Sequence, residues 1–461
     1  MKKQDLIKIN DLVWEIPKSF RSDMKVPGRI FSNEKMLEDI LMDESLLQVI
    51  NVATLPGIQK YVLAMPDIHE GYGFPVGGVA AFDIEQGIIS PGGIGFDINC
   101  GVRILQSDIT YDEIKNQISN LTLEIYNEVP SGVGRGGKLK LTNKDLDAIL
   151  VNGVDEMLKR GFAVKDDVKN CESNGHLVNA NSDYVSKNAK DRGRDQLGTI
   201  GAGNHFVEIQ KVEKIFDQEI AKKLNIFENQ ICVMIHCGSR GLGHQVATDY
   251  IRLMLQNSLQ FNISLPDNQL ACAPFNSVYG QQYFFAMNAA ANFAWANRQM
   301  ITWEIRKAWK KIFGNENLKL IYDIAHNIAK VEEYDNKKLI IHRKGATRAF
   351  PDQLVLIPGS MGTASYILIG QPESLQQSFG STCHGAGRVM SRTKARKLIH
   401  GSKLKQELET KGISVQSGSM SGLAEEAPLA YKDIESVVDV VHRMNIAKKV
   451  VRLKPVGVIK G

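Results

Sequence analysis

The sequence has no pair of cysteines with the C-x-x-C spacing. Its six cysteines are scattered along the chain as Cys100, Cys171, Cys232, Cys237, Cys272 and Cys383. Without such pairs a zinc knuckle is excluded, and isolated cysteines fit reduced thiols in a cytosol. The chain also lacks an apolar run long enough to span a bilayer, and residues 1–20 have no signal-peptide core. We therefore expect a cytoplasmic protein with no membrane partner.

The sequence has little excess charge of either sign, with a formal net charge of +5 over 461 residues. Such a small basic excess permits a nucleic-acid partner but does not establish one. An apolar content of 43% excludes disordered and fibrous classes. No internal repeat, low-complexity tract or linker divides the chain. We therefore expect one large mixed α+β domain over residues 1–461, with central sheets, surrounding helices and an active site built from glycine-rich loops.

A Walker A phosphate loop is also missing. Gly132, Gly137 and Lys138 meet the G-x-x-x-x-G-K spacing, but Leu139 stands where a Ser or Thr should hold magnesium. No buried strand precedes this stretch and no clear helix follows it directly. The segment 131–138 is therefore predicted to be a basic loop, which leaves contact with a phosphate open.

Hydrophobic periodicity predicts several elements. We expect a helix over residues 32–52, a buried helix over 283–313, and strands over 60–65, 231–235 and 318–324. Pro66 should end the first of these strands, so that Asp67 lies in a loop. An amphipathic helix and a short strand are expected to close the chain.

The most unusual stretch is S-P-G-G-I-G-F-D-I-N-C-G-V-R, residues 90–103. Its glycines allow tight, partly left-handed backbone, into which Asp97 and Cys100 are set three residues apart. A carboxylate and a thiolate provide one hard and one soft ligand, and a thiolate can bridge two ions. The alternative is a glycine-rich turn with a buried structural cysteine.

Six polar residues lie beside glycine or at predicted strand ends, spread over most of the chain: Asp97, Cys100, His205, His236, His326 and His384. A structural zinc site would instead draw its ligands from short local spacings. Ligands converging from distant loops are typical of a catalytic metal site with open positions. The remaining candidates His176, His342, His400 and His442 are interpreted as ordinary structural histidines.

Long motifs covering residues from about 65 to 461 make the chain resemble the RtcB family of RNA-splicing ligases. They are M-P-D-I-H-E-G-Y-G-F-P-V-G-G, G-G-I-G-F-D-I-N-C-G-V-R, G-A-G-N-H-F-V-E, H-C-G-S-R-G-L-G-H, A-N-F-A-W-A-N-R, H-R-K-G-A-T-R-A-F-P, P-G-S-M-G-T and S-T-C-H-G-A-G-R. One departure lies between Phe350 and Val355, where some relatives carry a longer segment.

The resemblance implies a ligase that uses GTP and two Mn²⁺ ions. It would join an RNA 3′-phosphate or 2′,3′-cyclic phosphate to a 5′-hydroxyl through a histidine-guanylate, in tRNA splicing or RNA repair. His384 would be the nucleophile, with Asp67 needed near the metals. One ion would be held by Asp97, Cys100 and His205, and the other by Cys100, His236 and His326.

The resemblance also assigns contacts with the guanylate to Asn204, Glu208, Ser360, Ser365, Tyr431 and Lys460. Gly385 and Gly387 beside the nucleophile would let the backbone approach the nucleotide phosphate. A basic surface for RNA phosphates is expected from Arg240, Arg343, Lys344, Arg348, Arg388 and Arg392. RNA is the expected partner, and the family leaves room for an archease-like activator.

Two other classes of function stay open. A metal-dependent phosphodiesterase or phosphatase would use the same metals but would not need His384 or Lys460. A non-catalytic RNA-binding protein would keep the basic surface without a use for Asp97 and Cys100. Labelling with GTP separates the three, because only the ligase retains the nucleotide covalently.

Overall fold

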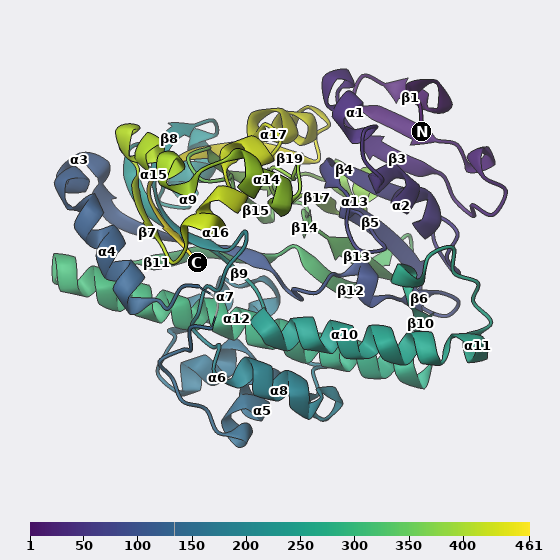
Figure 1. Ribbon diagram of the computed structural model, residues 1–461, viewed down its shortest axis with the longest axis horizontal. Coiled ribbons are helices and arrows are strands. Elements are labelled where there is room, and N and C mark those ends of the chain that lie inside the picture. The colour runs from purple at the N-terminus through teal and green to yellow at the C-terminus, as the bar shows by residue number, and fades with distance from the viewer. Residues whose placement is uncertain (133) are drawn as a thin grey trace.

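The computed structural model describes residues 1–132 and 134–461; Val133, in the basic loop predicted at 131–138, lies outside the described residues. Two large sheets form the interior (Figure 1). The first has the strand order β1-β2-β3-β4-β5-β13-β12. Its bounds are β1 Ile7–Asn10, β2 Val13–Ile16, β3 Gly28–Phe31, β4 Val62–His69, β5 Val76–Asp83, β12 Asn327–Tyr334 and β13 Lys337–Lys344.

The second sheet has the order β11-β7-β9-β8-β19-β16-β15, and β18 pairs in parallel with β19. The strands are β7 Gly101–Thr110, β8 Phe206–Ile215, β9 Gln230–Cys237, β11 Lys319–Ala325, β15 Leu354–Ile357, β16 Ser365–Gly370, β18 Ser414–Ser417 and β19 Ala447–Lys460. Two small sheets pair β6 Ile88–Ile89 with β10 Ala273–Pro274, and β14 Ala346–Arg348 with β17 Ser381–Cys383.

Helices surround the sheets. They are α1 Glu34–Ile40, α2 Ser45–Val52, α3 Tyr111–Ile114, α4 Ile118–Glu128, α5 Asn143–Asn152, α6 Val154–Lys159, α7 Lys165–Lys169, α8 Lys187–Arg194, α9 Gln218–Lys223, α10 Arg240–Gln256, α11 Ser258–Phe261, α12 Val278–Phe313, α13 Glu373–Ser378, α14 Arg392–Leu398, α15 Gly401–Thr410, α16 Met420–Glu425 and α17 Ile434–Arg443. The 3₁₀ turns are Lys3–Asp5, Lys18–Phe20, Pro91–Gly93, Lys115–Gln117, Glu172–Gly175, Ser182–Tyr184, Asn268–Leu270 and Pro428–Ala430.

The long helix α12 lies along one side of the sheets, beside α10 (Figure 1). Ser277 caps its first turn by accepting from the Gly280 N–H, and Gly314 ends it with a φ of 77°. Apolar and polar side chains are buried along most of its length, which confirms the buried helix predicted at 283–313. The strands predicted at 231–235 and 318–324 are confirmed within β9 and β11.

Two expectations about the first hundred residues were wrong. Residues 32–52 form two helices, α1 and α2, separated at Leu41–Glu44, where Asp43 accepts from the Ser45 N–H and starts a new turn. Pro66 does not end the strand that precedes it, because β4 continues to His69. Its missing N–H is tolerated where the pairing of β4 with β5 is irregular, between Ala64 and His69. Asp67 therefore lies in a strand.

The end of the chain is also more regular than expected. The amphipathic helix is confirmed as α17, which buries Val437, Val438 and Val441. The strand after it is not short, because β19 has 14 residues and pairs with both β8 and β16. Its position inside the sheet brings Lys460 next to Phe206 of β8.

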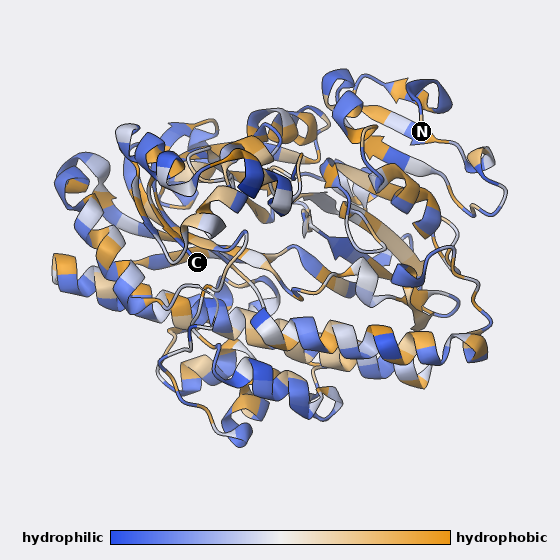
Figure 2. Cartoon of the chain, viewed as in Figure 1, coloured by the Kyte–Doolittle hydropathy of each residue, from blue (hydrophilic) through white to orange (hydrophobic). Residues whose placement is uncertain are grey.

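Mixed helices and mainly antiparallel sheets confirm the α+β fold class. In Figure 2 the outer helix α8 is mostly hydrophilic, as its sequence K-N-A-K-D-R-G-R requires. The single domain expected over residues 1–461 stays a prediction. Among the described residues, no helix is long and apolar enough to cross a membrane.

Candidate metal and nucleotide site

The structure brings five of the predicted metal ligands together in two overlapping groups. One contains Cys100, His236 and His326, and the other contains Asp97, Cys100 and His205. Within each group the ligand atoms lie within 4.8 Å of one another. The Cys100 Sγ lies 3.3 Å from His236 Nε2 and 3.4 Å from His205 Nε2, so the thiol stands between the two groups.

Four neighbouring strands of the second sheet position these ligands. In the order β11-β7-β9-β8, His326 follows β11, Cys100 precedes β7, His236 lies near the end of β9 and His205 precedes β8. The register pairs His236 with both Val102 and Phe206, and the His326 N–H donates to the Cys100 carbonyl at 2.8 Å. Antiparallel pairing therefore gathers ligands that are distant in sequence at one edge of the sheet.

Glycine is needed at this edge. A Cβ on Gly101 would lie 2.5 Å from the Ile324 carbonyl oxygen, and one on Gly238 would lie 2.4 Å from the Asp97 carboxylate. These close approaches let the segments carrying Cys100, His326 and Asp97 meet.

The electrostatics of the ligands favour a metal. Burial raises the pKa of Asp97, but the nearby His205 outweighs it and lowers that pKa to about 2. Burial raises the pKa of the Cys100 thiol to about 12, so a cation has to displace its proton. Ligand atoms 3.3–3.4 Å apart suit a shared ion with bonds of about 2.0–2.3 Å. Thiolate, imidazole and carboxylate together suit a first-row transition metal, so the residues fit the predicted ions.

His384 lies directly beside this cluster, with its ring centroid 4.9 Å from that of His326. Its Nδ1 is 2.6 Å from Oδ2 of the fully buried Asp67 in β4. The same oxygen accepts from the backbone N–H groups of His384 and Gly385, at 2.9 and 3.2 Å. Burial raises the pKa of Asp67, yet the neighbouring His384 outweighs it and the pKa is lowered. Asp67 thus fixes the loop and leaves His384 Nε2 as the ring nitrogen remote from the carboxylate.

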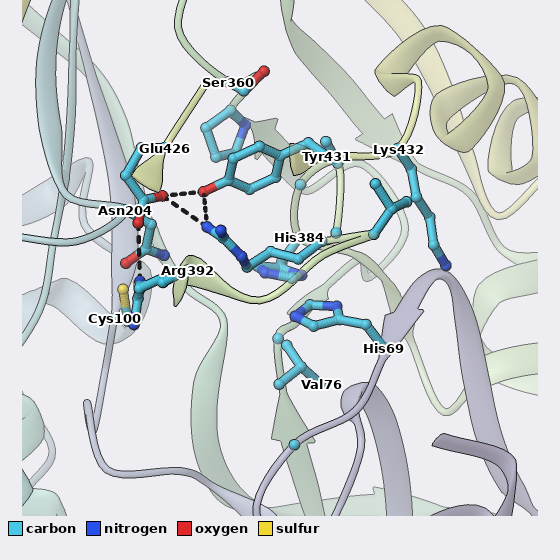
Figure 3. A pocket seen from close by; sticks show the side chains of 18 of the residues that line it. His69, Val76, Cys100, Asn204, Ser360, His384, Arg392, Glu426, Tyr431 and Lys432 are labelled. Atoms are coloured by element: carbon cyan, nitrogen blue, oxygen red, sulfur yellow. Dashed lines mark hydrogen bonds and ion pairs between the residues drawn. The ribbon is translucent and has the colours of Figure 1, made fainter. Parts of the chain in front are cut away.

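A cavity of about 900 Å³ connects these groups (Figure 3). It is lined by the metal-site residues Asp97, Cys100, His236 and His326, by His384, and by the predicted nucleotide contacts Asn204, Ser360, Gly385, Gly387, Tyr431 and Lys460. Gly387 has a φ of 72°, and a Cβ there would lie 2.1 Å from the Asp67 carbonyl oxygen. The loop after His384 can therefore pass close to β4 only with glycine at this position.

Glu208 and Ser365 do not line the cavity. They lie behind its wall, where Gln210 Nε2 donates to Glu208 Oε2 at 2.7 Å and to Ser365 Oγ at 2.9 Å. The Gly359 N–H in turn donates to Ser365 Oγ at 3.0 Å, which ties the pair to the loop carrying Ser360. Burial raises the pKa of Glu208 to about 8 and lowers that of Lys460 to about 8.

Sequence reasoning missed Gln210 and Glu426. Gln210 follows Glu208 by two residues, so alternation along a strand would have placed both on one face. The buried Glu426 accepts from Arg388 at 3.1 Å and Arg392 at 3.0 Å, and also from the Tyr431 hydroxyl (Figure 3). The only sequence signal for Glu426 was its place in the acidic pair of A-E-E-A-P-L-A-Y, where it lies five residues before Tyr431.

The residues expected to form a basic surface lie together only in part. Arg388 and Arg392 line the cavity, and the half-buried Arg240 donates to Thr199. Arg348 pairs with Gln353 and Glu172, and Lys138 of the 131–138 loop pairs with Glu128.

The surface assignment is wrong for Arg343 and Lys344, because both are buried. The Arg343 guanidinium forms two 2.7 Å bonds with Glu332, and Lys344 donates to the carbonyls of Tyr72 and Phe74 at 2.7 Å. Lys344 still lines the cavity, where burial lowers its pKa to about 7.

Arg343→Met is expected to lower the free energy of unfolding by about 3–5 kcal/mol, because the buried Glu332 carboxylate would lose its partner. Urea denaturation measures this loss. The double variant Arg343→Met/Glu332→Gln should recover part of it, since no buried charge is then unpaired. A loss under about 1 kcal/mol, typical of an exposed pair, would contradict the structural role.

Comparison with known proteins gives the family. The family described as tRNA-splicing ligase RtcB matches residues 48–461. Relatives named tRNA-splicing ligase RtcB include those of Archaeoglobus fulgidus, 51% identical over 477 positions, and Thermococcus kodakarensis, 48% identical over 477 positions; each alignment covers 99% of both chains. That of Nanoarchaeum equitans is 51% identical over 478 positions, again covering 99% of both. The resemblance seen in the motifs is confirmed, and the chain belongs to the RtcB family of tRNA-splicing ligases.

Proposed function

We propose that this protein is an RNA ligase that joins an RNA 3′-phosphate or 2′,3′-cyclic phosphate end to a 5′-hydroxyl end. It uses GTP and two Mn²⁺ ions, and its covalent intermediate is guanylate on His384, in tRNA splicing or RNA repair. One observation carries the proposal. A single cavity presents His384, whose Nδ1 lies against Asp67, directly beside two overlapping sets of metal ligands.

The first step would be attack of His384 Nε2 on the α-phosphorus of GTP. A phosphorus–nitrogen bond forms, the bond to the pyrophosphate breaks, and pyrophosphate leaves. Asp67 contributes by orienting the ring through Nδ1 and by fixing the backbone of His384 and Gly385. The manganese ions, held by Asp97, Cys100, His205, His236 and His326, would supply positive charge against the phosphate oxygens.

Joining then requires an activated phosphate, since a 3′-phosphate by itself has no good leaving group. Transfer of the guanylate from His384 to the RNA 3′-phosphate would supply one. The 5′-hydroxyl could then attack the 3′-phosphorus and release GMP, forming the new phosphodiester bond. A phosphatase would have no use for a nucleotide site beside the metals.

Glu208 and Lys460 carry groups complementary to guanine, although only Lys460 lines the cavity. Glu208 Oε1 is buried without a hydrogen-bond partner among the described residues, and Lys460 is a buried cation of the neighbouring strand. The edge of guanine offers N–H donors from N1 and N2 and an acceptor at O6. A free carboxyl oxygen and an ammonium group are complementary to that pattern.

Incubating the protein with Mn²⁺ and GTP labelled at the α-phosphorus, followed by denaturation, tests the proposal. We expect label on the protein with GTP and at most a few per cent of it with ATP. Complete absence of covalent label would favour the phosphodiesterase or RNA-binding alternatives. A second assay with a 3′-phosphate strand and a 5′-hydroxyl strand measures joining itself, and adding an archease-like protein to it tests activation.

A further inference from the structure

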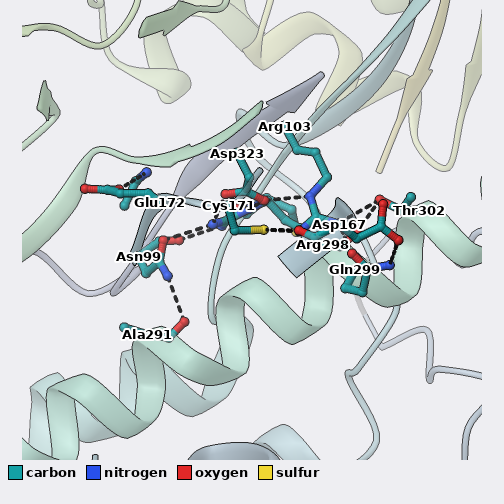
Figure 4. A network of polar contacts seen from close by, with 12 residues as sticks. Asn99, Arg103, Asp167, Cys171, Glu172, Ala291, Arg298, Gln299, Thr302 and Asp323 are labelled. Carbon is teal, nitrogen blue, oxygen red and sulfur yellow. Dashed lines mark hydrogen bonds and ion pairs between the residues drawn. The ribbon is translucent and has the colours of Figure 1, made fainter. Parts of the chain in front are cut away.

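The chain has a buried polar cluster that joins α12 to β7 and β11, two of the strands that position the metal ligands (Figure 4). Arg103, Arg298 and Asp323 are fully buried, and both guanidinium groups donate to the one carboxylate. Desolvating these three charges is costly, and hydrophobic residues of the same size would often be as stable. The cluster therefore calls for an explanation beyond stability.

Arg298 contacts the backbone beside two metal ligands and a side chain of the strand that leads to a third. Its Nη1 donates at 2.8 Å to the carbonyl of Asn99, the residue before Cys100, and at 2.8 Å to the carbonyl of Cys237, the residue after His236. Its other nitrogens donate to Asp323 in β11, the strand that leads into His326, at 2.8 and 2.9 Å. One guanidinium thus joins the segments that carry all three ligands of one group.

The conformation of Asn99 depends on the same contact. Its φ is 51°, in the left-handed region, which asparagine adopts more readily than most other residues except glycine. Arg298 Nη2 donates to the Asn99 side chain at 3.0 Å, and Asn99 Nδ2 donates to the Ala291 carbonyl of α12 at 2.7 Å. The turn that points Cys100 toward both ligand groups is therefore held by α12.

The neighbouring residue, Asn297, holds the second ligand group. Its Oδ1 accepts from the Gly198 and Thr199 N–H groups at 2.7 and 3.2 Å, and its Nδ2 donates to the Gly238 carbonyl at 3.1 Å. The next residue in that loop, Ile200, accepts through its carbonyl oxygen from His205 Nδ1 at 3.1 Å. A carbonyl can only accept, so His205 Nδ1 is a donor to Ile200, and this bond turns Nε2 toward Asp97 and Cys100.

We propose that Asn297 and Arg298 are positioning residues that preset the geometry of the metal site from α12. The inference rests on the proposed function, because it concerns the Mn²⁺ ions of that site. Neither side chain lines the cavity, so both act through the residues beside the ligands and not by contact with a bound molecule.

Arg306 provides a matched control on the same helix. It is also buried and also pairs with a buried carboxylate, Asp167, through two 2.7 Å bonds. Among the described residues its hydrogen bonds go only to Asp167 and Leu318, neither of which is next to a metal ligand. Arg298→Met and Arg306→Met should both lower the melting temperature. Only Arg298→Met should weaken Mn²⁺ binding, by about 10–100-fold, measured by calorimetry and by the EPR spectrum of the bound ion.

Two further variants separate positioning from stability. Arg298→Lys keeps a positive charge opposite Asp323 but cannot reach both carbonyls, so the melting temperature should recover more than the Mn²⁺ affinity. Asn297→Ala should weaken binding of the ion held by Asp97, Cys100 and His205 more than binding of the ion held by Cys100, His236 and His326. This variant decides the question if Arg298→Met does not fold.

The inference would be overturned if Arg298→Met bound Mn²⁺ with the affinity and EPR spectrum of the wild type. If Arg298→Met does not fold, the same result in Asn297→Ala would overturn it. So would an equal loss of affinity in Arg306→Met. If the wild-type protein itself bound no Mn²⁺, the proposed metal site would fail, and that result is distinguishable because it does not depend on any variant.

Discussion

Cys100→Ser is expected to lose both manganese ions and self-guanylylation together. The Sγ lies between the two ligand groups, so removing it takes a ligand from each, whereas His236 or Asp97 belongs to only one. Serine keeps the size of the side chain, but its hydroxyl has too high a pKa to bridge two cations. Elemental analysis of the purified variant measures the metal content, which should fall from two ions to fewer than one.

The other five cysteines provide the control for Cys100. All are buried and free, and the same change to serine in each should leave metal content near that of the wild type. Mn²⁺ affinity of the wild type should also fall on acidification, because protons compete for the thiolate and imidazole ligands. Two bound metals in Cys100→Ser would remove the bridging role.

His384→Ala should abolish covalent labelling by GTP, a loss of at least a thousandfold, without changing the fold. The side chain is 13% exposed at the cavity, and without the ring the Asp67 carboxylate still accepts from the backbone N–H groups of residues 384 and 385, so the fold should be retained. The phosphoramidate formed by the wild type should be labile in acid and stable in alkali. Denaturing gels of labelled protein, with acid and alkali treatment, measure both properties.

His442→Ala is a suitable comparison for His384→Ala, because His442 lies in α17 outside the cavity. It should label as the wild type does. Label that persists in His384→Ala, or that resists acid, would assign the guanylate to another residue.

Much of the site could be predicted because its ligands occur in local patterns. Each of four ligands lies beside glycine or at the end of a strand, both in the sequence pattern and in the structure: Cys100, His205, His236 and His326. The buried helix α12 was equally predictable, since its apolar residues run all round it. The motifs of the RtcB family then supplied the roles that spacing alone does not give.

The rest depended on tertiary contacts. From the sequence alone, a basic side chain such as Arg343 is interpreted as surface charge. Its partner Glu332 lies on β12 and reaches it only once β12 and β13 have paired. Pro66 was read as a strand end, although an irregular pairing accommodates it. Asn297 and Arg298 form part of a helix pattern, and nothing local shows that they contact three other segments.

The wide spacing of the metal ligands along the chain has a consequence for folding kinetics. Apart from Asp97 and Cys100, no two ligands are close in sequence, and they meet only after β11, β7, β9 and β8 have paired. The loop-closure entropy of pairing such distant segments is lost late in folding, so partly folded chains offer the ion at most Asp97 and Cys100. Manganese should therefore leave the folding rate unchanged and slow unfolding, because it binds only the native state. Manganese binding would thus prolong the lifetime of the folded protein, and a strong chelator would shorten it.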